Sequence, residues 1–574
     1  MNNQLVTKDY LVFILYFLIV ALYGYWIYRR RKSKEHDSKA FFLAAGSLTW
    51  WAIGASLIAS NISAEQFVGM SGDGFFAGVA VAVYEWVAAI ALIIIAVWFM
   101  PIYLKNKIYT MPQFLKMRYN NTVSLIMTLF WLFLYILVNL TSIMYLGAVA
   151  ISGLLGPEYL HPIMIGLALF ALVITLGGMK VIGYTDVIQV AVLIIGGFAT
   201  IYFALQQVSQ HVGNNTGVAD GFSTLVKAAP DHFHMIFKKP TTGSSQYDIQ
   251  RYVILPGISM YFLGQWIVNL NYWGCNQYIT QRALGADLNT ARTGILFAGM
   301  LKIMMPIIVM LPGIAAYVLY KNGVHMTGLT ANIGPENLYQ IKDKAYSSVL
   351  AFLPTGLRGL SIAALTAAIV ASLAGKANSI STIFTLDIYK KYLGKEASEK
   401  QLVIVGRIAI VAAMLLGLML TWNDTLGIGG EGGFTFIQKY TGFISPGILA
   451  MFLLGMFWKR TTGTAALAGI LVGFLTSVIF NNYAAQWFGH DTLLYTAFPV
   501  VKAGVTTWEI PFLVCMGWSG VFTVLIMVAI SLAGPKVNSN AIQFESGMFK
   551  VSPRIIVMII ITLLLLTAIY VRFW

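Results

Sequence analysis

The chain has 574 residues, of which 58% are hydrophobic and only 10% are charged, whereas an average soluble domain is roughly 45–50% apolar and about 25% charged. This composition excludes a water-soluble enzyme. The formal net charge of +15 would suggest a nucleic-acid partner in a soluble protein, but the basic residues here lie in short loops between apolar runs. A lipid bilayer is therefore the expected partner, and we expect no nucleic acid.

Fourteen apolar runs are each long enough to cross a bilayer, which requires about 20 residues. The runs are continuous and lack the alternating polarity of the roughly 10-residue strands of a membrane barrel. They cover residues 9–28, 48–72, 77–104, 122–152, 161–179, 182–206, 252–275, 294–320, 356–376, 402–421, 433–456, 463–482, 510–533 and 554–573. The sequence thus predicts an all-α integral membrane protein with 14 transmembrane helices.

The loops between these runs differ in their content of Lys and Arg. If the loops are assigned alternately from an outside N-terminus, the inside loops carry about twice as many basic residues as the outside loops, and residues 29–39 alone contribute six. The positive-inside rule then predicts a multi-pass protein of the cell membrane, plasma or inner, with both termini outside. The inside segment 378–391 is expected to form an amphipathic helix that lies along the membrane.

The motifs of the common enzyme classes are missing from the sequence. There is no phosphate-binding G-x-x-x-x-G-K-[ST] loop, no H-E-x-x-H and no G-x-S-x-G. The seven histidines lie in loops or at the edge of a run, and Cys275 and Cys515 lie within runs, so that neither a disulfide framework nor a metal cluster is indicated. We expect no catalytic residues. A secondary transporter, a channel or a receptor remains.

Two runs are interrupted by polar residues near mid-depth, at 60–66 (SNISAEQ) and 269–277 (NLNYWGCNQ). Non-helical backbone at this depth is tolerated where it lines a cavity, and paired interruptions indicate a transporter binding site. The two runs are five spans apart, which implies inverted repeats. The alternative is that these residues only form hydrogen bonds between helices. Tyr272 and Trp273 adjoin the second interruption, where a ring can stack on a sugar.

Four charged residues fall in apolar surroundings, namely Glu65, Glu85, Asp186 and Lys302. An unpaired charge there costs at least about 2.5–3.5 kcal/mol, so these groups are expected to face a polar cavity or one another. A carboxylate, a lysine and several amides can satisfy the hydroxyls of a neutral polyhydroxylated solute. For Asp186 the alternative is a structural ion pair near the inside face.

At these residues the sequence resembles the sodium/solute symporter family, in its sodium/glucose cotransporter branch. The matching runs are WWAIGASLIASNISAEQFVGMSG (50–72), YEW (84–86), VNLTS (138–142), TDVIQV (185–190), NYWGCNQY (271–278), AAIVASLA (367–374), STIFTLDIYK (381–390) and IQKYTGFISPGILAMFLLGMFWKR (437–460). The resemblance implies the leucine-transporter fold with two inverted five-helix repeats. The implied parts are an extra helix with a basic inside loop (1–47), the first repeat (48–206), an outside loop (207–251), the second repeat (252–456) and three accessory helices (457–574).

The resemblance also implies a set of site residues and Na⁺ as the coupling ion. The implied sugar site consists of Gln66, Glu85, Asn269, Lys302, Gln438 and Tyr272, with Tyr272 stacking on the sugar as the inner gate and Asn139 as its hydrogen-bond partner. The implied outer gate consists of Met70, Tyr84 and Phe434. The implied sodium site consists of backbone carbonyls of Ala59, Ile62 and Ala368 and the hydroxyl of Ser372, because a hard cation prefers oxygen ligands.

Some residues depart from the family pattern. Ala371 stands where a second serine of the sodium site is usual, so one hydroxyl ligand is missing and weaker sodium binding is expected. Ala88 and Asn271 replace a serine and an aromatic residue near the sugar site, so that galactose or glucose is not assured. Ala368 and Ala374 offer no hydroxyl for a second ion, and we expect one sodium ion per sugar.

The expected function is therefore sodium-coupled symport of a neutral sugar, similar to galactose or glucose, by alternating access and without covalent chemistry. The alternatives are a sodium symporter of myo-inositol, sialic acid or an amino acid, and a sodium-independent channel or facilitator. A transporter that also acts as a receptor is disfavoured, because the longest inside loops have only about 20–26 residues. The Glu85 and Lys302 charges with three amides, and the lack of a matching Arg, favour a neutral solute over a carboxylate.

Overall fold

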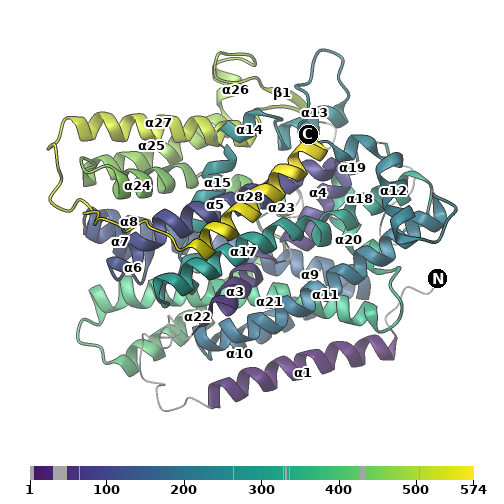
Figure 1. Ribbon diagram of the computed structural model, residues 1–574, viewed down its shortest axis with the longest axis horizontal. Helices are drawn as coiled ribbons and strands as arrows, with labels where there is room; N and C mark the ends of the chain where they lie inside the picture. The colour runs from purple at the N-terminus through teal and green to yellow at the C-terminus, as the bar shows by residue number, and fades with distance from the viewer. Residues whose placement is uncertain are drawn as a thin grey trace.

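The computed structural model is almost wholly helical, as predicted. It describes residues 6–29, 48–63, 65–262, 264–326, 329, 333–334, 337–426, 428, 433–502 and 505–574. The sheet found in these residues is one antiparallel hairpin of β1 (Phe498–Lys502) and β2 (Val505–Glu509), in which Phe498 pairs with Glu509. Most of the long helices run side by side along one direction (Figure 1). Such a bundle satisfies the backbone hydrogen bonds within each helix, as a bilayer requires.

The first half of the chain contains the first interruption, which lies between α3 and η3. Its longer elements are α1 (Thr7–Arg29), α3 (Trp50–Asn61), α5 (Val83–Ile94), α8 (Asn121–Phe133), α9 (Thr141–Leu155), α10 (Leu160–Thr175), α11 (Met179–His211) and α12 (Val218–Ala228). The shorter ones are η3 (Glu65–Met70), α4 (Ser71–Ala77), η4 (Gly78–Ala82), η5 (Ile95–Phe99), α6 (Met100–Lys105), α7 (Met111–Arg118), η6 (Leu134–Leu140), η7 (Pro157–Tyr159) and η8 (Pro230–Phe233). Here η3, η5 and η6 are wider π-type turns that extend the helices beside them.

The second half of the chain contains the second interruption. Its longer elements are α15 (Gly264–Gly274), α17 (Leu288–Val309), α18 (Leu311–Lys321), α21 (Leu357–Ile383), α22 (Glu399–Thr421), α23 (Gly433–Gly442), α24 (Ser445–Phe457), α25 (Gly463–Asn482), α27 (Phe512–Leu532) and α28 (Pro553–Phe573). The shorter ones are α13 (Gln246–Ile254), α14 (Ser259–Phe262), α16 (Gln277–Leu284), α19 (Leu338–Ile341), η10 (Lys342–Lys344), α20 (Ala345–Leu350), η11 (Phe384–Leu393) and α26 (Ala484–Trp487).

Helices occupy all fourteen of the predicted apolar ranges, but fewer of them qualify individually as membrane spans. Ten helices of the described chain are long and apolar enough to cross a membrane, or up to twelve if each of two bent pairs counts as one span. Two predicted runs account for the lower number. The run 48–72 is divided between the 12-residue α3 and the segments that follow it, and α10 has 16 residues, fewer than the roughly 20 that a bilayer requires.

The predicted separate helix at residues 378–391 is wrong. Helix α21 continues directly into η11, and the combined helix covers Leu357–Leu393. The polar residues at the start of this segment bond to neighbouring helices: Ser381 donates to the Gly406 carbonyl at 2.7 Å, and Gln281 donates to Thr382 at 2.9 Å. Because these hydroxyls are buried and bonded, the pattern of alternating polarity marks helix contacts and not a membrane surface.

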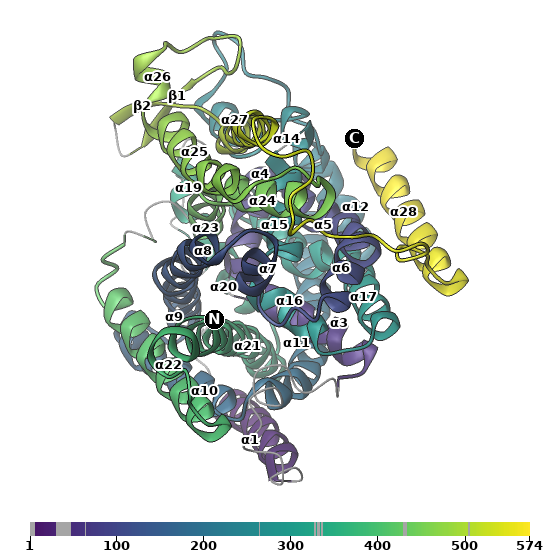
Figure 2. The same ribbon diagram turned by 90° about the vertical axis from the view of Figure 1, so that its left-hand side faces the viewer.

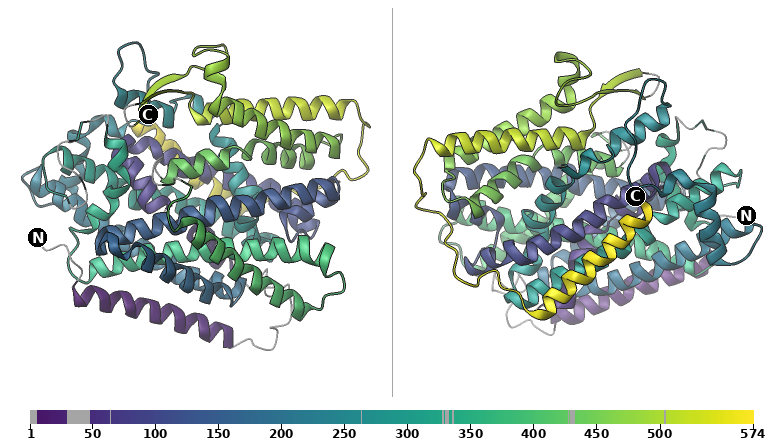
Figure 3. Two further views of the ribbon diagram at one scale, coloured as in Figure 1. Left: turned by 180° about the vertical axis from the view of Figure 1, so that it is seen from behind. Right: turned by 45° about the horizontal axis from the view of Figure 1, so that its top comes forward.

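The bundle has a buried centre, and its outer helices expose apolar side chains. Helices α3 and α21 lie against each other and against α11 and α16, whereas α1 and α28 lie at the outside of the end-on view in Figure 2, at its lower and right-hand edges. Both outer helices expose large apolar side chains, for example Leu11 and Ile14 on α1 and Leu564 on α28. The β-hairpin and the loop before α13 project next to each other at one end (Figure 3), where Gln246 donates to the Pro499 carbonyl at 3.0 Å.

Candidate functional site

The first interruption begins where α3 ends at Asn61. Ile62 has an extended backbone, with φ −81° and ψ 104°, and helical structure resumes at Glu65. The amide of Ser63 lies 3.4 Å from the side-chain oxygen of Gln66 instead of bonding within the helix. The Ser60 carbonyl near the break instead accepts hydrogen bonds from side chains of two other helices, because Ser372 and Tyr278 both donate to it, each at 2.9 Å.

The second interruption separates α15 from α16. Helix α15 ends at Gly274, and Asn276 is extended, with φ −100° and ψ 123°. Tyr103 donates to the freed Gly274 carbonyl at 2.7 Å, and Tyr135 donates to the Asn276 side chain. Both predicted interruptions are thus present, and in each case side chains replace the lost helix bonds, as buried backbone requires.

A cavity lies between the two interruptions. Its lining contains nine of the residues predicted for the solute site and the gates: Gln66, Tyr84, Glu85, Asn139, Asn269, Tyr272, Lys302, Phe434 and Gln438. Trp273, which was singled out beside the second interruption, and Asn271, which departs from the family pattern near the sugar site, also line it. The lining residues that were not predicted individually are Asn61, Leu134, Val268, Asn276, Lys376, Ile437, Thr441 and Ser445. Met70 is fully buried outside this lining. The fold therefore brings together side chains from η3, η6, α5, α15, α17, α21 and α23.

The charged centre of the cavity is an ion pair between Lys302 and Glu85. The Lys302 ammonium contacts the Glu85 carboxylate and also donates to the side-chain oxygen of Asn61. The Trp273 ring lies with its centroid 5.2 Å from the same ammonium. Pairing of this kind is what a charge in the membrane interior requires. Because both members of the pair line the cavity, they can also contact a solute within it.

The amides around this pair offer both donors and acceptors. Asn269 donates to the Gln265 carbonyl at 2.9 Å, and Asn271 donates to the Ser445 hydroxyl at 2.9 Å. The amide nitrogen of Asn139 has no hydrogen-bond partner among the described residues. A buried polar atom without a partner calls for an explanation, and a ligand oxygen is one.

Tyr272 lines the cavity, and its hydroxyl bonds to two neighbours. Its hydroxyl contacts the hydroxyl of Tyr278, and it accepts from the Asn61 amide at 3.2 Å. The predicted hydrogen bond to Asn139 is not found among the described residues. The Tyr272 hydroxyl instead contacts Tyr278, which follows the break at Asn276.

Apolar side chains cover another part of the cavity. The rings of Tyr84 and Phe434 meet edge to face, with their centroids 5.0 Å apart. Gly69 allows α23 to approach closely, since a Cβ there would lie 2.6 Å from the Cβ of Phe434. Met70 follows directly and is 0% exposed. The three predicted outer-gate residues are therefore buried close to one another along η3, α5 and α23.

The predicted sodium ligands lie where the first interruption contacts α21. The Ser372 hydroxyl lies 2.9 Å from the Ser60 carbonyl oxygen and 3.4 Å from that of Ala59. Ala371 and Ala368 are buried on the same helix, and Ile62 is buried at the break. These oxygens are the ligand type that a hard cation prefers. No cluster of three His, Cys, Asp or Glu side chains that could hold a transition metal is found in the described residues.

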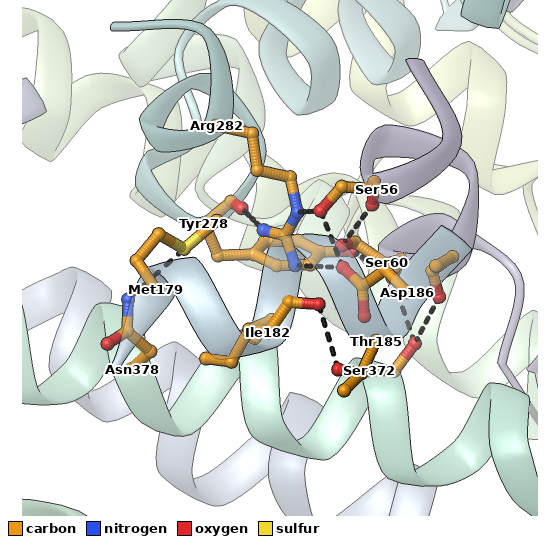
Figure 4. A network of polar contacts seen from close by, with 12 residues as sticks. Ser56, Ser60, Met179, Ile182, Thr185, Asp186, Tyr278, Arg282, Ser372 and Asn378 are labelled. Carbon is orange, nitrogen blue, oxygen red and sulfur yellow. Dashed lines mark hydrogen bonds and ion pairs between the residues drawn. The ribbon is translucent and has the colours of Figure 1, made fainter. Parts of the chain in front are cut away.

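A second polar network surrounds Asp186 (Figure 4). Its carboxylate accepts from Ser56 at 2.5 Å and lies 3.7 Å from the Arg282 guanidinium. Arg282 also donates to the Ser56 hydroxyl at 2.8 Å and to the Tyr278 carbonyl. The Ser60 hydroxyl extends the network to the Ser56 carbonyl at 2.6 Å. Asp186 therefore belongs to an ion pair that ties α11 to α3 and α16, which was the alternative expectation for it.

Several residues of the site could have been found from the sequence. Asn61 and Asn276 lie in the polar interruptions themselves, and only their individual roles were missed. Arg282 follows the second interruption, but it is far from Asp186 in the sequence, and no local pattern indicates that the two form an ion pair. Lys376 is the last residue of a predicted apolar run, where a charged residue is itself a signal of function. Glu65 was predicted to be an intramembrane charge, but its side chain lies outside the described residues.

Comparison with known proteins identifies related transporters. Residues 41–473 match the model of the sodium:solute symporter family. The chain is 44% identical to a sodium/glucose cotransporter of Vibrio parahaemolyticus, over 85% of this chain and 88% of that one. It is 33% identical to sodium/myo-inositol cotransporter 2 of Mus musculus, over 82% of this chain and 69% of that one. A solved Na⁺-coupled sialic acid symporter, in a substrate-bound outward-open state, superposes with a TM-score of 0.74 at 19% identity, over 93% of this chain and 99% of that one.

Proposed function

The chain belongs to the sodium:solute symporter family, and we propose that it carries a neutral sugar similar to galactose or glucose into the cell together with one sodium ion. The observation that carries this proposal is the cavity between two helix breaks, in which the Glu85 and Lys302 charges are surrounded by amides. A hydroxyl both donates and accepts hydrogen bonds, so such a lining can replace the water around a sugar. The sodium/glucose cotransporter relatives support the same solute class.

The proposed architecture has two inverted five-helix repeats at residues 48–206 and 252–456. We infer that α1 and the basic loop (1–47) precede the first repeat, that 207–251 connects the two outside the cell, and that 457–574 adds three accessory helices. The likeness of the chain's fold to that of a sodium-coupled symporter supports a leucine-transporter fold, and the breaks on α3 and between α15 and α16 support the pairing of repeats. In this arrangement fourteen segments cross the membrane and both termini lie outside.

The solute is proposed to lie against the Tyr272 ring. Gln66, Glu85, Asn269, Lys302 and Gln438 then bond its hydroxyls, because these side chains line the same cavity. Met70, Tyr84 and Phe434 close the outer side, where their apolar surfaces exclude water. Asn139 provides a free amide donor next to the gate. Release to the inside requires Tyr272 to leave its contacts with Asn61 and Tyr278.

Sodium is proposed to bind between α3 and α21. The backbone carbonyls of Ala59, Ile62 and Ala368 and the hydroxyl of Ser372 supply the ligands, and Ser372 already bridges to the broken helix. Bound sodium fastens the two helices together and favours the outward-facing state. Loss of the ion releases them and favours the inward-facing state. This difference in affinity between the states couples the ion to the solute.

The ion gradient supplies enough free energy for accumulation. One sodium ion that moves down about 100 mV and a tenfold concentration gradient releases about 3.7 kcal/mol, which supports roughly 500-fold accumulation of a neutral solute at a one-to-one ratio. A flux ratio close to two sodium ions per sugar would contradict the proposed single site.

Counterflow in proteoliposomes tests the proposal. Proteoliposomes that contain the protein are tested for exchange of labelled hexoses, myo-inositol or sialic acid, each with and without sodium. The Ser372→Ala variant is measured in the same way beside the unchanged protein. We expect sodium-dependent exchange of a neutral hexose and loss of the sodium dependence in Ser372→Ala. Sodium-independent exchange in the unchanged protein would identify a facilitator. A preference for sialic acid would overturn the proposal that the solute is neutral.

A further inference from the structure

A second lysine lines the cavity, and the proposed cycle gives it no role. Lys376 lies on α21 and is 2% exposed. It is one helical turn beyond Ser372, so that both side chains project from the same face of α21, with their Cβ atoms about 5–6 Å apart. A charge at this depth is costly, which makes an ionisable residue a sign of function.

One aromatic ring connects Lys376 to the proposed sodium site. The Lys376 ammonium lies 5.0 Å from the centroid of the Tyr278 ring, a distance at which a cation is attracted to the ring face. The Tyr278 hydroxyl donates to the Ser60 carbonyl at 2.9 Å, and Ser372 donates to the same carbonyl at 2.9 Å. The ring therefore holds the ammonium beside the helix break at which sodium is proposed to bind.

We infer that the positive charge of Lys376 sets the affinity of the sodium site, because it repels the ion held between α3 and α21. This inference rests on the proposed function, since it requires sodium at Ser372. Two like charges in a site of low dielectric repel each other over several ångströms. The charge of Lys376 thus keeps sodium weakly bound. Weak binding makes release into the cell easier, and it adds to the loss of a ligand at Ala371.

The test removes the charge and measures the sodium requirement. In proteoliposomes with saturating sugar, the sodium concentration for half-maximal uptake is compared between the unchanged protein and Lys376→Met. We expect a decrease of about tenfold in this sodium concentration, and a clearly smaller change in the KM for sugar measured at saturating sodium. Lys376→Arg keeps the charge and is expected to keep the original sodium requirement. If Lys376→Met is not recovered folded, Lys376→Gln takes its place.

A matched control removes a lysine from the same continuous helix. Lys391 lies in η11, 15 residues beyond Lys376, which is about 22 Å along a helix, so Lys391→Met is expected to leave the sodium requirement unchanged. An unchanged or higher sodium requirement in Lys376→Met overturns the inference. So does an equal change in sodium requirement and sugar KM, which would indicate a purely structural role.

Ser372→Ala separates this inference from the proposed function. If Ser372→Ala loses sodium dependence and Lys376→Met behaves like the unchanged protein, the inference fails and the sodium site stands. If Ser372→Ala retains sodium dependence, the proposed sodium site is wrong. A Lys376→Met effect of the same size in that background would then show that Lys376 acts on an ion elsewhere, which overturns the inference as well.

Discussion

Two buried ion pairs in this bundle have different surroundings. Glu85 and Lys302 line the cavity, and Lys302 also reaches Asn61. Asp186 and Arg282 bond instead to Ser56 and to backbone, and their side chains are at most 1% exposed. The first pair can exchange contacts with a solute, whereas the second pair is enclosed by the helices around it and does not line this cavity. Similar charges therefore suit recognition in one place and helix positioning in the other.

The largest expected effect is the loss of uptake in Glu85→Ala. This change removes the carboxylate from the cavity and leaves Lys302 with Asn61 as its polar contact. We expect sugar uptake to fall more than 100-fold in proteoliposomes, because a sugar hydroxyl loses its acceptor and an uncompensated charge enters the site. The exposed carboxylate of Glu158 provides the control, since Glu158→Ala is expected to transport normally. Uptake at the original rate in a folded Glu85→Ala protein would remove Glu85 from the solute site.

Variants of Tyr272 test whether the two ion pairs are coupled. Its hydroxyl bonds to Asn61 beside the first pair and to Tyr278, whose carbonyl accepts from Arg282 of the second pair. Tyr272→Phe keeps the ring and loses these bonds, so we expect a two- to fivefold decrease in uptake, consistent with about 0.5–1 kcal/mol for a neutral hydrogen bond. Tyr272→Ala is expected to stop accumulation against a gradient. Equal uptake by all three proteins would assign Tyr272 to core packing.

The enclosed pair is expected to affect stability more than transport. Asp186→Ala leaves the buried Arg282 guanidinium without its carboxylate, and breaking a buried pair costs about 3–5 kcal/mol. We expect a lower Tm in detergent and reduced uptake that is still sodium-dependent. Adding Arg282→Met is expected to restore most of the Tm, because no buried charge is then left alone. By contrast, adding Lys302→Met to Glu85→Ala is not expected to restore uptake.

These outcomes separate the two pairs clearly. Complete loss of sodium dependence in Asp186→Ala, with an unchanged Tm, would place Asp186 at the ion and contradict its structural role. Restored uptake in the double variant of Glu85 and Lys302 would make the cavity pair structural as well. Either result would remove the difference between the two regions.

The fold could be predicted from the sequence because its main determinants are local. Continuous apolar runs specify helices in a bilayer, and the polar residues at 60–66 and 269–277 mark the two breaks. The number of helices that qualify individually as membrane spans could not be predicted in the same way, because η3 and α4 continue into η4, α5 and η5 without a loop. Whether residues 378–391 extend α21 or leave it depends on partners such as Gly406 and Gln281, which sequence alone does not place.

The site could be predicted as a set of residues but not as a set of contacts. Nine predicted residues line one cavity. They could be named from the sequence because their motifs resemble those of a known family. The contact of Tyr272 with Asn61 and the pairing of Asp186 with Arg282 join residues that are far apart in the sequence, and the contact of Tyr272 with Tyr278 spans the break at Asn276. Such contacts form through tertiary packing, which no local pattern encodes.

The smallest expected effect is at Ala371, which is buried next to Ser372 on α21. A serine at this position would add a hydroxyl oxygen to the proposed ligands, and one further ligand strengthens the binding of a hard cation. We therefore expect Ala371→Ser to lower the sodium concentration for half-maximal uptake about threefold, with an unchanged maximal rate. Ala363→Ser, eight residues earlier on the same buried helix and therefore about 12 Å away along its axis, is the matched control and is expected to have no effect. If the sodium requirement of Ala371→Ser stayed the same, the ion would not lie beside residue 371, and the enclosed region around Ser372 would serve only to hold the helices together.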